Sequence, residues 1–224
     1  MCGRFALTMP AEAMEELFDA VGVDGLPREA RYNICPTQTV ATVRSQAGAR
    51  LLEPMRWGFL PQWYKTPNDG PLLINARAET VAEKPAFRSA CRERRCLIPA
   101  TGFYEWTKDA AGKKLPWYIF PARANAPIAF AGIWQDWTPK EGGDPLRTVA
   151  ILTTAANSDL AEVHHRMPVV IDPDDFALWL GESGKGAARL MTAAPLGHFE
   201  NYRVNTMVNG TKAQGPELLD PVKI

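Results

Sequence analysis

The sequence lacks a net charge, because its 25 lysines and arginines balance 25 aspartates and glutamates over 224 residues. Proteins that hold long nucleic acids mainly by electrostatic attraction are usually strongly basic, so a broad basic binding surface is not expected. It also lacks any run approaching the roughly 20 apolar residues of a membrane span, and its start lacks the apolar run of a secretory signal. We therefore expect a protein that contacts no membrane and stays in the cytoplasm.

Disulfide and metal-binding patterns are missing too. The cysteines of the chain are Cys2, Cys35, Cys91 and Cys96. They show neither the dense, even spacing of a secreted disulfide scaffold nor a CxxC pair of the kind that binds zinc. We expect these cysteines to be reduced thiols, and we expect neither a metal site nor a cofactor.

The sequence does contain enough apolar residues for a real core. Hydrophobic residues make up 46% of a chain whose length falls within the range of single domains. Its 19 prolines are spread along the chain rather than gathered into a linker, and no segment repeats. We expect one domain spanning residues 1–224, and a monomer.

Two segments have helical patterns. The first covers residues 11–21, with a glycine at position 22 to end it, and its apolar residues at helical spacing are Met14, Leu17, Phe18 and Val21. The second begins with Asp172 as N-cap and Pro173 as its first helical residue, followed by acidic residues in the first turn. The residues that it should bury are Phe176, Trp179 and Leu180.

Short β-branched and aromatic runs, separated by Gly, Pro, Asn and Asp, predict strands in much of the remaining chain. These runs are TVATVR (39–44), RCLIP (95–99), PWYIF (116–120), PIAFAGIW (127–134) and TVAILTT (148–154). Two helices among so many short strands indicate an α+β fold, which is a single domain dominated by antiparallel β-sheet with a few flanking helices.

Cys2 offers unusual chemistry. Removal of Met1 would leave Cys2 with an α-amine and a thiol on adjacent carbons. An α-amine titrates near about 7.7 to 8.0, against about 10.4 for lysine, so far more of it is neutral and nucleophilic at neutral pH. It is suited to attack an aldehyde, and the same residue's sulfur could then close a five-membered thiazolidine ring. Taken alone, the position is more simply that of a small residue after the initiator Met.

Five further segments combine polar residues with aromatic or proline neighbours, where a plain core would be apolar. They are RYNICPT (31–37), WGFLPQW (57–63), NARAET (75–80), IPATGFYEW (98–106) and HHRMPVV (164–170). Together with MCGRF at the start, in the same order and with similar spacing, they resemble the SOS response-associated peptidase (SRAP) family of abasic-site-processing proteins. The resemblance runs from residue 2 to about residue 220 and implies the barrel-like SRAP fold.

The resemblance implies covalent chemistry at Cys2. In that family the initiator Met is removed by self-cleavage, and the exposed cysteine forms a thiazolidine DNA–protein crosslink with the ring-opened sugar of an abasic site in single-stranded DNA. The adduct is then kept, reversed or resolved by strand scission, an AP-lyase activity. The class implied is therefore a self-processing peptidase that acts in the DNA-damage (SOS) response.

The resemblance also assigns three further catalytic residues. Asn75 binds the cysteine amine or the sugar oxygen, Glu105 passes protons, and His164 protonates the sugar ring oxygen. The alternatives for these side chains are a turn-capping Asn, a strand-edge surface Glu and a structural His. The family usually has Asp after the histidine, whereas this chain has His165, which leaves a one-residue ambiguity between His164 and His165.

Contacts with DNA follow from the same resemblance. The residues implied near the lesion and its phosphates are Arg4, Asn33, Pro36, Arg77 and Arg166, and the candidate stacking surfaces are Trp63 and Tyr64. We expect Trp57 and Trp106 in the core. The expected partner is single-stranded DNA containing abasic sites, so the protein should be nucleoid-associated when bound to damaged DNA. The arginines concentrated in the first 95 residues are either a local basic face or scattered solvated side chains.

Two other classes stay open. A glutamine-amidotransferase-type N-terminal nucleophile hydrolase also begins Cys-Gly after Met removal and uses the thiolate on an amide, although only MCG supports it. A non-catalytic single-strand binding module would use the arginines and tryptophans, and the zero net charge is awkward for it. A general protease is not indicated, because the evident substrate for a peptidase activity is the chain's own first residue.

Overall fold

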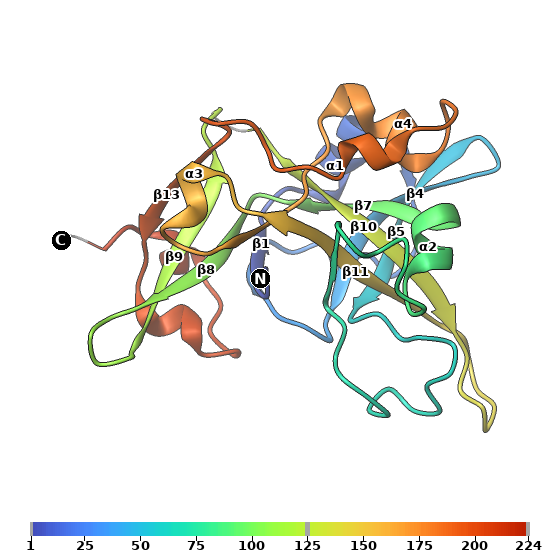
Figure 1. The fold of residues 1–224 in the computed structure, drawn as a ribbon, viewed down its shortest axis with the longest axis horizontal. Helices are drawn as coiled ribbons and strands as arrows, with labels where there is room; N and C mark the ends of the chain where they lie inside the picture. Colours follow the sequence, from blue (N-terminus) through green and yellow to red (C-terminus); the bar gives the residue numbers. More distant parts are fainter. Residues whose placement is uncertain (1, 124–125, 223–224) are drawn as a thin grey trace.

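The computed structural model describes residues 2–123 and 126–222. Most of this chain forms β-strands in two sheets, with short helices around them (Figure 1). Antiparallel ladders outnumber parallel ones, and the predicted α+β class is confirmed. In the described part of the chain, no helix is long and apolar enough to cross a membrane.

The larger sheet closes on itself. Its strands run in the order β12 (Arg166–Pro168), β11 (Leu146–Ala155), β10 (Ile128–Trp137), β7 (Arg95–Ala100), β4 (Thr39–Gln46), β5 (Ala49–Trp57) and β2 (Ala20–Gly22), and β6 (Asn75–Arg77) pairs with β11 beside that path. A parallel pairing of β11 with β5 joins the ends of the path from β11 to β5. The strands between them therefore form a closed barrel, which protects their edges.

The smaller sheet carries the start of the chain. Its strands run in the order β13 (Phe199–Arg203), β9 (Lys114–Pro121), β8 (Gly102–Lys108), β1 (Phe5–Leu7) and β3 (Arg31–Ile34). The chain passes from barrel strand β7 into β8 at Thr101, whose amide bonds to Ala6. A side chain at Gly102 would meet the Tyr118 ring within 2.3 Å, so this crossing requires glycine. All the predicted strand runs fall inside β4, β7, β9, β10 or β11, except for Pro127 at one end.

The first predicted helix is shorter than its apolar pattern suggests. Helix α1 spans Ala11–Phe18, and Asp19 ends it in a left-handed conformation with φ 48°. The next residues form β2, which pairs in parallel with β5, so the extension to residue 21 is wrong. Val21 is 64% exposed on that strand and not part of a buried helical face. Pairing with the barrel edge overrides the helical spacing of Val21.

The second predicted helix is split. A 3₁₀ turn, η1 (Pro173–Asp175), precedes α4 (Phe176–Leu180), and Asp172 is extended but makes no side-chain cap. Phe176 and Trp179 are buried as expected, whereas Leu180 is half-buried. Phe18 stacks on Phe176 at 5.0 Å, so α1 and α4 lie side by side against the barrel (Figure 1).

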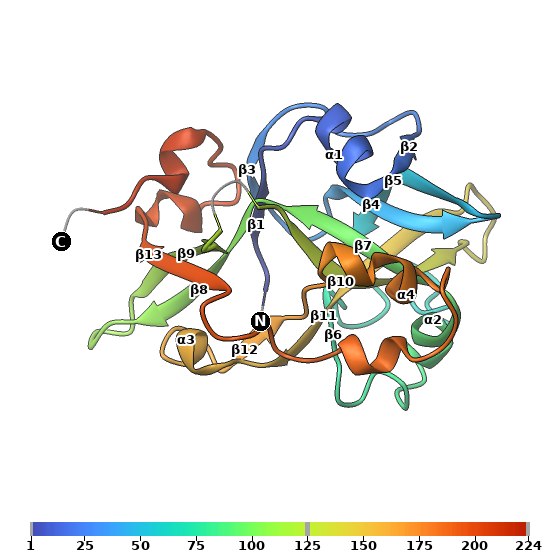
Figure 2. The ribbon, with the colours of Figure 1, turned by 90° about the horizontal axis from the view of Figure 1, so that it is seen from above.

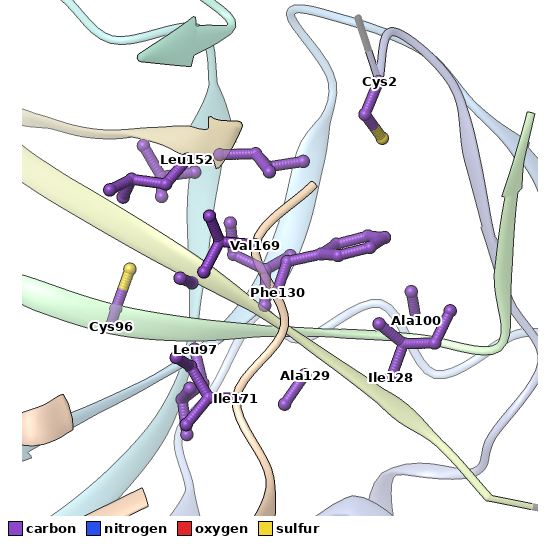
Figure 3. Packing of buried hydrophobic residues seen from close by; sticks show 14 of the residues in the cluster. Cys2, Cys96, Leu97, Ala100, Ile128, Ala129, Phe130, Leu152, Val169 and Ile171 are labelled. Carbon is purple, nitrogen blue, oxygen red and sulfur yellow. The ribbon is translucent and has the colours of Figure 1, made fainter. Parts of the chain in front are cut away.

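The remaining short elements lie on loops between strands or, for the last two, after the final strand β13. They are α2 (Arg88–Glu93), α3 (Ser158–Ala161), η2 (Ala187–Leu190), η3 (Thr206–Asn209) and η4 (Pro216–Leu219). The core fills the barrel and continues to the start of β1, where Cys2 lies at one edge of the drawn cluster (Figure 3). Phe5 packs edge-on against both Trp57 and Phe130, which places the start of the chain against the barrel core.

Candidate active site

Four separate segments bring the predicted catalytic residues together. Cys2 precedes β1, Asn75 begins β6, Glu105 lies on β8, and His164 lies between α3 and β12. Strand β8 pairs with β1, which sets Glu105 beside the start of the chain. Strands β6 and β12 both pair with β11 and carry the other two residues to the same place. Figure 2 shows β12 and α3 on the side of the molecule where the chain starts.

Cys2 is enclosed and its backbone is held. Its side chain has no exposed surface. Its carbonyl oxygen accepts a 2.9 Å hydrogen bond from Asn75 Nδ2. Burial raises the pKa of the Cys2 thiol, and the negative charge of nearby Glu105 raises it further. The thiol is therefore protonated at neutral pH.

Glu105 is a buried carboxyl group facing a histidine. It is 3% exposed, and burial raises its pKa above the ordinary value. Its Oε2 lies 4.0 Å from His164 Nε2. A carboxyl with a raised pKa beside an imidazole makes a pair that can give and take protons near neutral pH.

The hydrogen bonding of His164 defines where its proton sits. The backbone amide of Arg166 donates a 2.9 Å hydrogen bond to His164 Nδ1. The carbonyl oxygen of Arg166 also lies 3.2 Å from this nitrogen, but an amide N–H can only donate, so Nδ1 is the acceptor. The neutral ring then carries its proton on Nε2, on the side of Glu105. Burial lowers the pKa of His164, which favours this neutral form at neutral pH.

The neighbouring histidine occupies a different environment. His165 is exposed, and its ring stacks on that of His164 at 4.4 Å. The geometry therefore points to His164, not His165, as the imidazole that faces Glu105.

Two residues predicted to contact DNA are engaged with the C-terminal strap, which we define as residues 205–214. Asn33 is fully buried, accepts from Arg4 Nη1 at 2.7 Å, and donates to the carbonyls of Gly210 and Ala213 at 2.9 Å each. The same Arg4 nitrogen donates to Val208 O at 2.7 Å. These bonds make Arg4 and Asn33 the anchor of the strap.

The arginines named for phosphate contact differ sharply in accessibility. Arg77 is exposed at the end of β6. The Arg166 side chain is only 11% exposed and forms a two-pronged ion pair with Glu79, at 2.7 and 2.9 Å. Pro36 is half-buried in the turn after β3, where Thr37 has a positive φ of 73°. Arg77 is thus the accessible cation of this set.

The two candidate stacking residues also differ. Trp63 is 54% exposed, whereas Tyr64 is 7% exposed and its hydroxyl donates to Pro71 O at 3.3 Å. Tyr64 packs in a small cluster with Leu60 and Trp137, so its ring offers no open face. Burial leaves Trp63 as the stacking candidate.

Trp63 and Tyr64 lie away from Cys2. The Tyr64 cluster contains Trp137, which pairs with Leu146 at the start of β11. Asn75 pairs with Ile151, five residues further along the same strand, a distance of roughly 17 Å. DNA touching both regions would have to span that strand.

The two tryptophans expected in the core have different fates. Trp57 is fully buried and donates from Nε1 to Ile74 O at 3.0 Å, as expected. Trp106 is half-buried and packs against the smaller core cluster around Tyr104, so it lies at the edge of the core rather than inside it. Its Nε1 donates to Asn209 Oδ1 at 2.6 Å, and the Arg4 guanidinium lies 5.7 Å from its ring centroid. Trp106 therefore lines the junction between β8 and the strap.

Glu79 is the residue of this region that the sequence did not single out. It lies inside NARAET, but its partner Arg166 is 87 residues away, and no local pattern links them. The one available signal was that Glu79 is a charged residue inside the polar motif NARAET and had no assigned role there. Pairing with Arg166 lowers the pKa of Glu79 to about 2, so it is ionised at neutral pH.

All four cysteines are buried free thiols, as expected. Within residues 2–123 and 126–222, no group of three or more His, Cys, Asp or Glu side chains is arranged to hold a metal ion. The side chains that meet at the candidate site are the Cys2 thiol, the Glu105 carboxyl, the His164 imidazole and the Asn75 amide.

Comparisons with known proteins identify the family. Residues 1–211 match the family model described as SOS response associated peptidase (SRAP). The chain is 35% identical over 227 residues to the abasic site processing protein YoaM of Bacillus subtilis (strain 168), with 98% of each chain covered. It is 34% identical over 231 residues to the abasic site processing protein YedK of Escherichia coli (strain K12), covering 99% of this chain and 100% of YedK. The chain belongs to the SRAP family.

The likeness extends to vertebrates and to solved structures. The abasic site processing protein HMCES of Gallus gallus is 28% identical, and the match covers 100% of this chain and 79% of HMCES. A crystal structure of a protein from Bacteroides thetaiotaomicron superposes with a TM-score of 0.85 at 23% identity, covering 99% of this chain and 100% of that one. The match to the Bacteroides thetaiotaomicron structure supports the fold alone.

Proposed function

We propose that this chain processes abasic sites in single-stranded DNA by forming a covalent thiazolidine crosslink through Cys2, after Met1 has been removed. What supports the proposal is the enclosure of Cys2 by Asn75, Glu105 and His164, in a chain whose relatives are named abasic site processing proteins. An abasic nucleotide has no base to read, so a covalent step supplies the recognition that base contacts cannot.

The reaction starts at the amine. The neutral α-amine of Cys2 attacks the aldehyde of the ring-opened sugar, and loss of one water gives an imine. Because burial keeps the Cys2 thiol protonated, the thiol does not compete for the aldehyde as a thiolate. The sulfur then bonds to the imine carbon, and the S–H proton passes to the imine nitrogen to give the thiazolidine. The net change is condensation with loss of one water.

Glu105 and His164 are placed to handle the protons. His164 carries its proton on Nε2, so it can donate to the sugar ring oxygen as the ring opens. Glu105 can take the proton that leaves the amine and return it to the departing hydroxyl. The amide of Asn75 holds the Cys2 carbonyl and so orients the residue for attack.

The same groups would serve the two side activities. Release of Met1 is hydrolysis of its peptide bond to Cys2, which exposes the amine, with Glu105 and His164 as proton carriers. Strand scission follows when the imine loses a proton from sugar carbon 2 and expels the 3′ phosphate. Both steps use groups that already face Cys2.

DNA contact is proposed to begin at the exposed residues. Arg77 lies two residues beyond Asn75 and can bind a phosphate, and Trp63 can stack on an unpaired base for about 1 to 3 kcal/mol. Arg4, Asn33 and Arg166 would have to exchange intramolecular partners before they could contact DNA.

The decisive experiment uses a single-stranded oligonucleotide that carries one abasic site. The purified protein should give a slower-migrating band that resists heat and denaturant, and Cys2→Ala should abolish it. Intact mass should show loss of one Met residue, followed by gain of the oligonucleotide mass minus one water. Cys2→Ser should leave at most a labile imine, detected only after borohydride reduction.

Two results would overturn this proposal. One is a Cys2→Ala variant that crosslinks as well as the parent. The other is active protein that permanently keeps Met1. An amidohydrolase would instead release ammonia from glutamine, but all six motifs fall within the SRAP match, and no separate observation favours that reading.

A further inference from the structure

The Arg166 side chain is held by two residues, Glu79 and Thr153, beside the candidate active site. Its guanidinium pairs with both oxygens of Glu79, and Nη2 also donates to Thr153 O at 2.6 Å. Thr154 Oγ1 donates to Glu79 Oε1 at 3.4 Å, so the carboxylate is itself tied to β11. A two-pronged pair between a guanidinium and a carboxylate fixes direction as well as distance.

The backbone of Arg166 sets the state of His164. Its amide donates to His164 Nδ1 at 2.9 Å, which leaves the proton of the neutral ring on Nε2. His164 Nε2 lies 4.0 Å from Glu105 Oε2. A shift of the Arg166 backbone would loosen this hydrogen bond and allow the proton to move to Nδ1, away from Glu105.

Glu79 and Asn75 belong to one short segment. Asn75 begins β6, and Glu79 follows in the turn after this strand, where Ala78 N donates to Thr153 O at 2.8 Å. The ion pair therefore connects the segment that holds the Cys2 carbonyl to the segment that carries His164. In the sequence, Glu79 and Arg166 are 87 residues apart, so the ion pair links segments that are distant along the chain.

We propose that Glu79 is a positioning residue: by clamping the Arg166 side chain, it holds the Arg166 amide against His164 Nδ1 and so keeps the catalytic proton on Nε2. The proposal rests on the proposed function for its effect on rate. Its effect on the imidazole, however, can be measured without DNA. It also implies that Arg166 acts chiefly through this bridge, because its guanidinium is already bonded to Glu79 and Thr153.

The test compares variants that remove the charge or shorten the side chain. Glu79→Gln keeps the shape but not the charge, and Glu79→Asp keeps the charge on a shorter stem. The matched control is Glu182→Gln, because Glu182 makes a similar two-pronged pair with Arg50 at 2.7 and 2.9 Å on another part of the molecule. Thermal melting shows whether each variant is folded.

The first readout is the histidine tautomer. The chain has only three histidines, so ¹⁵N-histidine labelling gives a simple spectrum, and His164→Gln identifies the His164 signals. In the parent, His164 should have Nε2 protonated and Nδ1 unprotonated. Glu79→Gln should shift the ring towards a mixture of tautomers, whereas Glu182→Gln should not. Among the described residues, the charged groups near the ring are Glu105 from β8 and the adjoining His165 and Arg166. Besides burial, the positive charge of the amino terminus also lowers the pKa of His164, and none of these groups is changed in either variant.

The second readout separates rate from binding. General acid–base catalysis contributes about 10²- to 10⁴-fold, so partial loss of the correct tautomer should slow crosslinking at saturating DNA by about tenfold in Glu79→Gln. Binding of abasic DNA before crosslinking should not weaken, because removal of Glu79 frees a cation. Glu79→Asp should give an intermediate rate, and Glu182→Gln the parent rate.

A folded Glu79→Gln or Glu79→Asp variant with the parent's tautomer overturns the proposal, as does an equal loss of rate in Glu182→Gln. If Glu79→Gln fails to fold, the tautomer in Glu79→Asp decides. Absence of crosslinking by the parent protein would overturn the proposed function instead, and the tautomer measurement would still decide the role of Glu79.

Discussion

Glu105 is a carboxyl group held where water is scarce, and that placement changes its chemistry. Burial raises its pKa above the ordinary value of 4.5, so a larger share of it is protonated near neutral pH than for a surface glutamate. Burial also lowers the pKa of His164, which lies 4.0 Å away. The two shifts bring an acid and a base closer in proton affinity, which is what proton exchange between them requires.

The shift of Glu105 predicts a pH dependence of stability. A carboxyl whose pKa is raised on folding binds more protons in the folded state, so it costs stability as pH rises from 4.5 towards its raised value. Glu105→Gln removes this cost, and loss of the nearby negative charge also lowers the His164 pKa further. Both effects have the same sign, so the variant should gain stability relative to the parent between pH 5 and pH 7.5, measured by chemical denaturation.

Glu29→Gln serves as the control for that measurement, because Glu29 is exposed. Its difference from the parent should be the same at both pH values. If the Glu105→Gln curve runs parallel to the parent's, the carboxyl titrates alike in folded and unfolded chains, and burial has not perturbed it.

At the scale of single residues, the sequence predicts which side chains meet at the candidate site, but not their protonation or their burial. The motifs lead to Asn75, Glu105 and His164 through their resemblance to the SRAP family. The tautomer of His164 depends on the Arg166 amide and could not be inferred from residue types. Burial of Tyr64 depends on Trp137, more than 70 residues away, so neighbouring residues could not separate it from Trp63.

The C-terminal strap is an element held by side chains rather than by a ladder. Asn33 bonds to two of its carbonyls, Arg4 to a third, and Trp106 to Asn209. Three backbone carbonyls of the strap thus find partners on Arg4, just before β1, and on Asn33 of β3, where they would otherwise have relied on water, and the Asn209 side chain finds its partner on β8. The strap is thereby fixed against the smaller sheet.

Asn33→Ala should destabilise the protein strongly. The change leaves the carbonyls of Gly210 and Ala213 and one Arg4 donor without their partner, at a cost of about 2 to 4 kcal/mol. For a chain of this length the melting temperature should fall by roughly 5 to 12 °C. Calorimetry measures the loss, and limited proteolysis should cut within residues 205–214 first.

Asn209→Ala is the matched change within the same strap. Asn209 is exposed, accepts one bond from Trp106 Nε1 and donates a long one, at 3.5 Å, to Lys114 O, so the loss should stay under about 1 kcal/mol. Equal losses in both variants would show that buried anchoring at Asn33 does not hold the strap.

Elements were predictable where local pattern and pairing agree. The β-branched runs of β4 and β11 became barrel strands because alternation and burial favour the same conformation. The helix ending at Phe18 was overextended because Val21 fits a helical period, while the parallel pairing of β2 with β5 decides its conformation. The spacing of apolar residues near Val21 cannot indicate a pairing with β5, which lies about 30 residues further along the chain.

Closure of the barrel is a property of the whole chain. Strands β5 and β11 meet in parallel at Arg56 with Thr148 and at Trp57 with Val149. Parallel neighbouring strands require a long connection between them. Here the connection from β5 to β11 includes β7 and β10, which are themselves strands of the barrel. Local pattern gives the strands but not this contact, so from the sequence the barrel shape rested on resemblance alone.

The charges of the molecule are largely used internally. Arg44 and Arg147 both pair with buried Glu53, Arg50 pairs with Glu182, and Arg95 donates to backbone carbonyls. The arginines concentrated in the first 95 residues therefore supply internal partners more than a continuous basic face. With zero net charge, attraction of DNA has to depend on a few exposed cations such as Arg77.

This arrangement predicts weak salt dependence for the step that precedes crosslinking. Each phosphate neutralised on a single strand contributes a slope of about −0.7 to the logarithm of affinity against the logarithm of salt, so about two contacts give a slope near −1.4. Anisotropy of abasic single-stranded DNA with the Cys2→Ala variant measures it without covalent capture. Adding Arg77→Ala should reduce the slope by about 0.7, whereas Arg92→Ala, at an exposed position on α2, should leave it unchanged. A slope steeper than about −4 would mean that a broad basic surface holds the DNA.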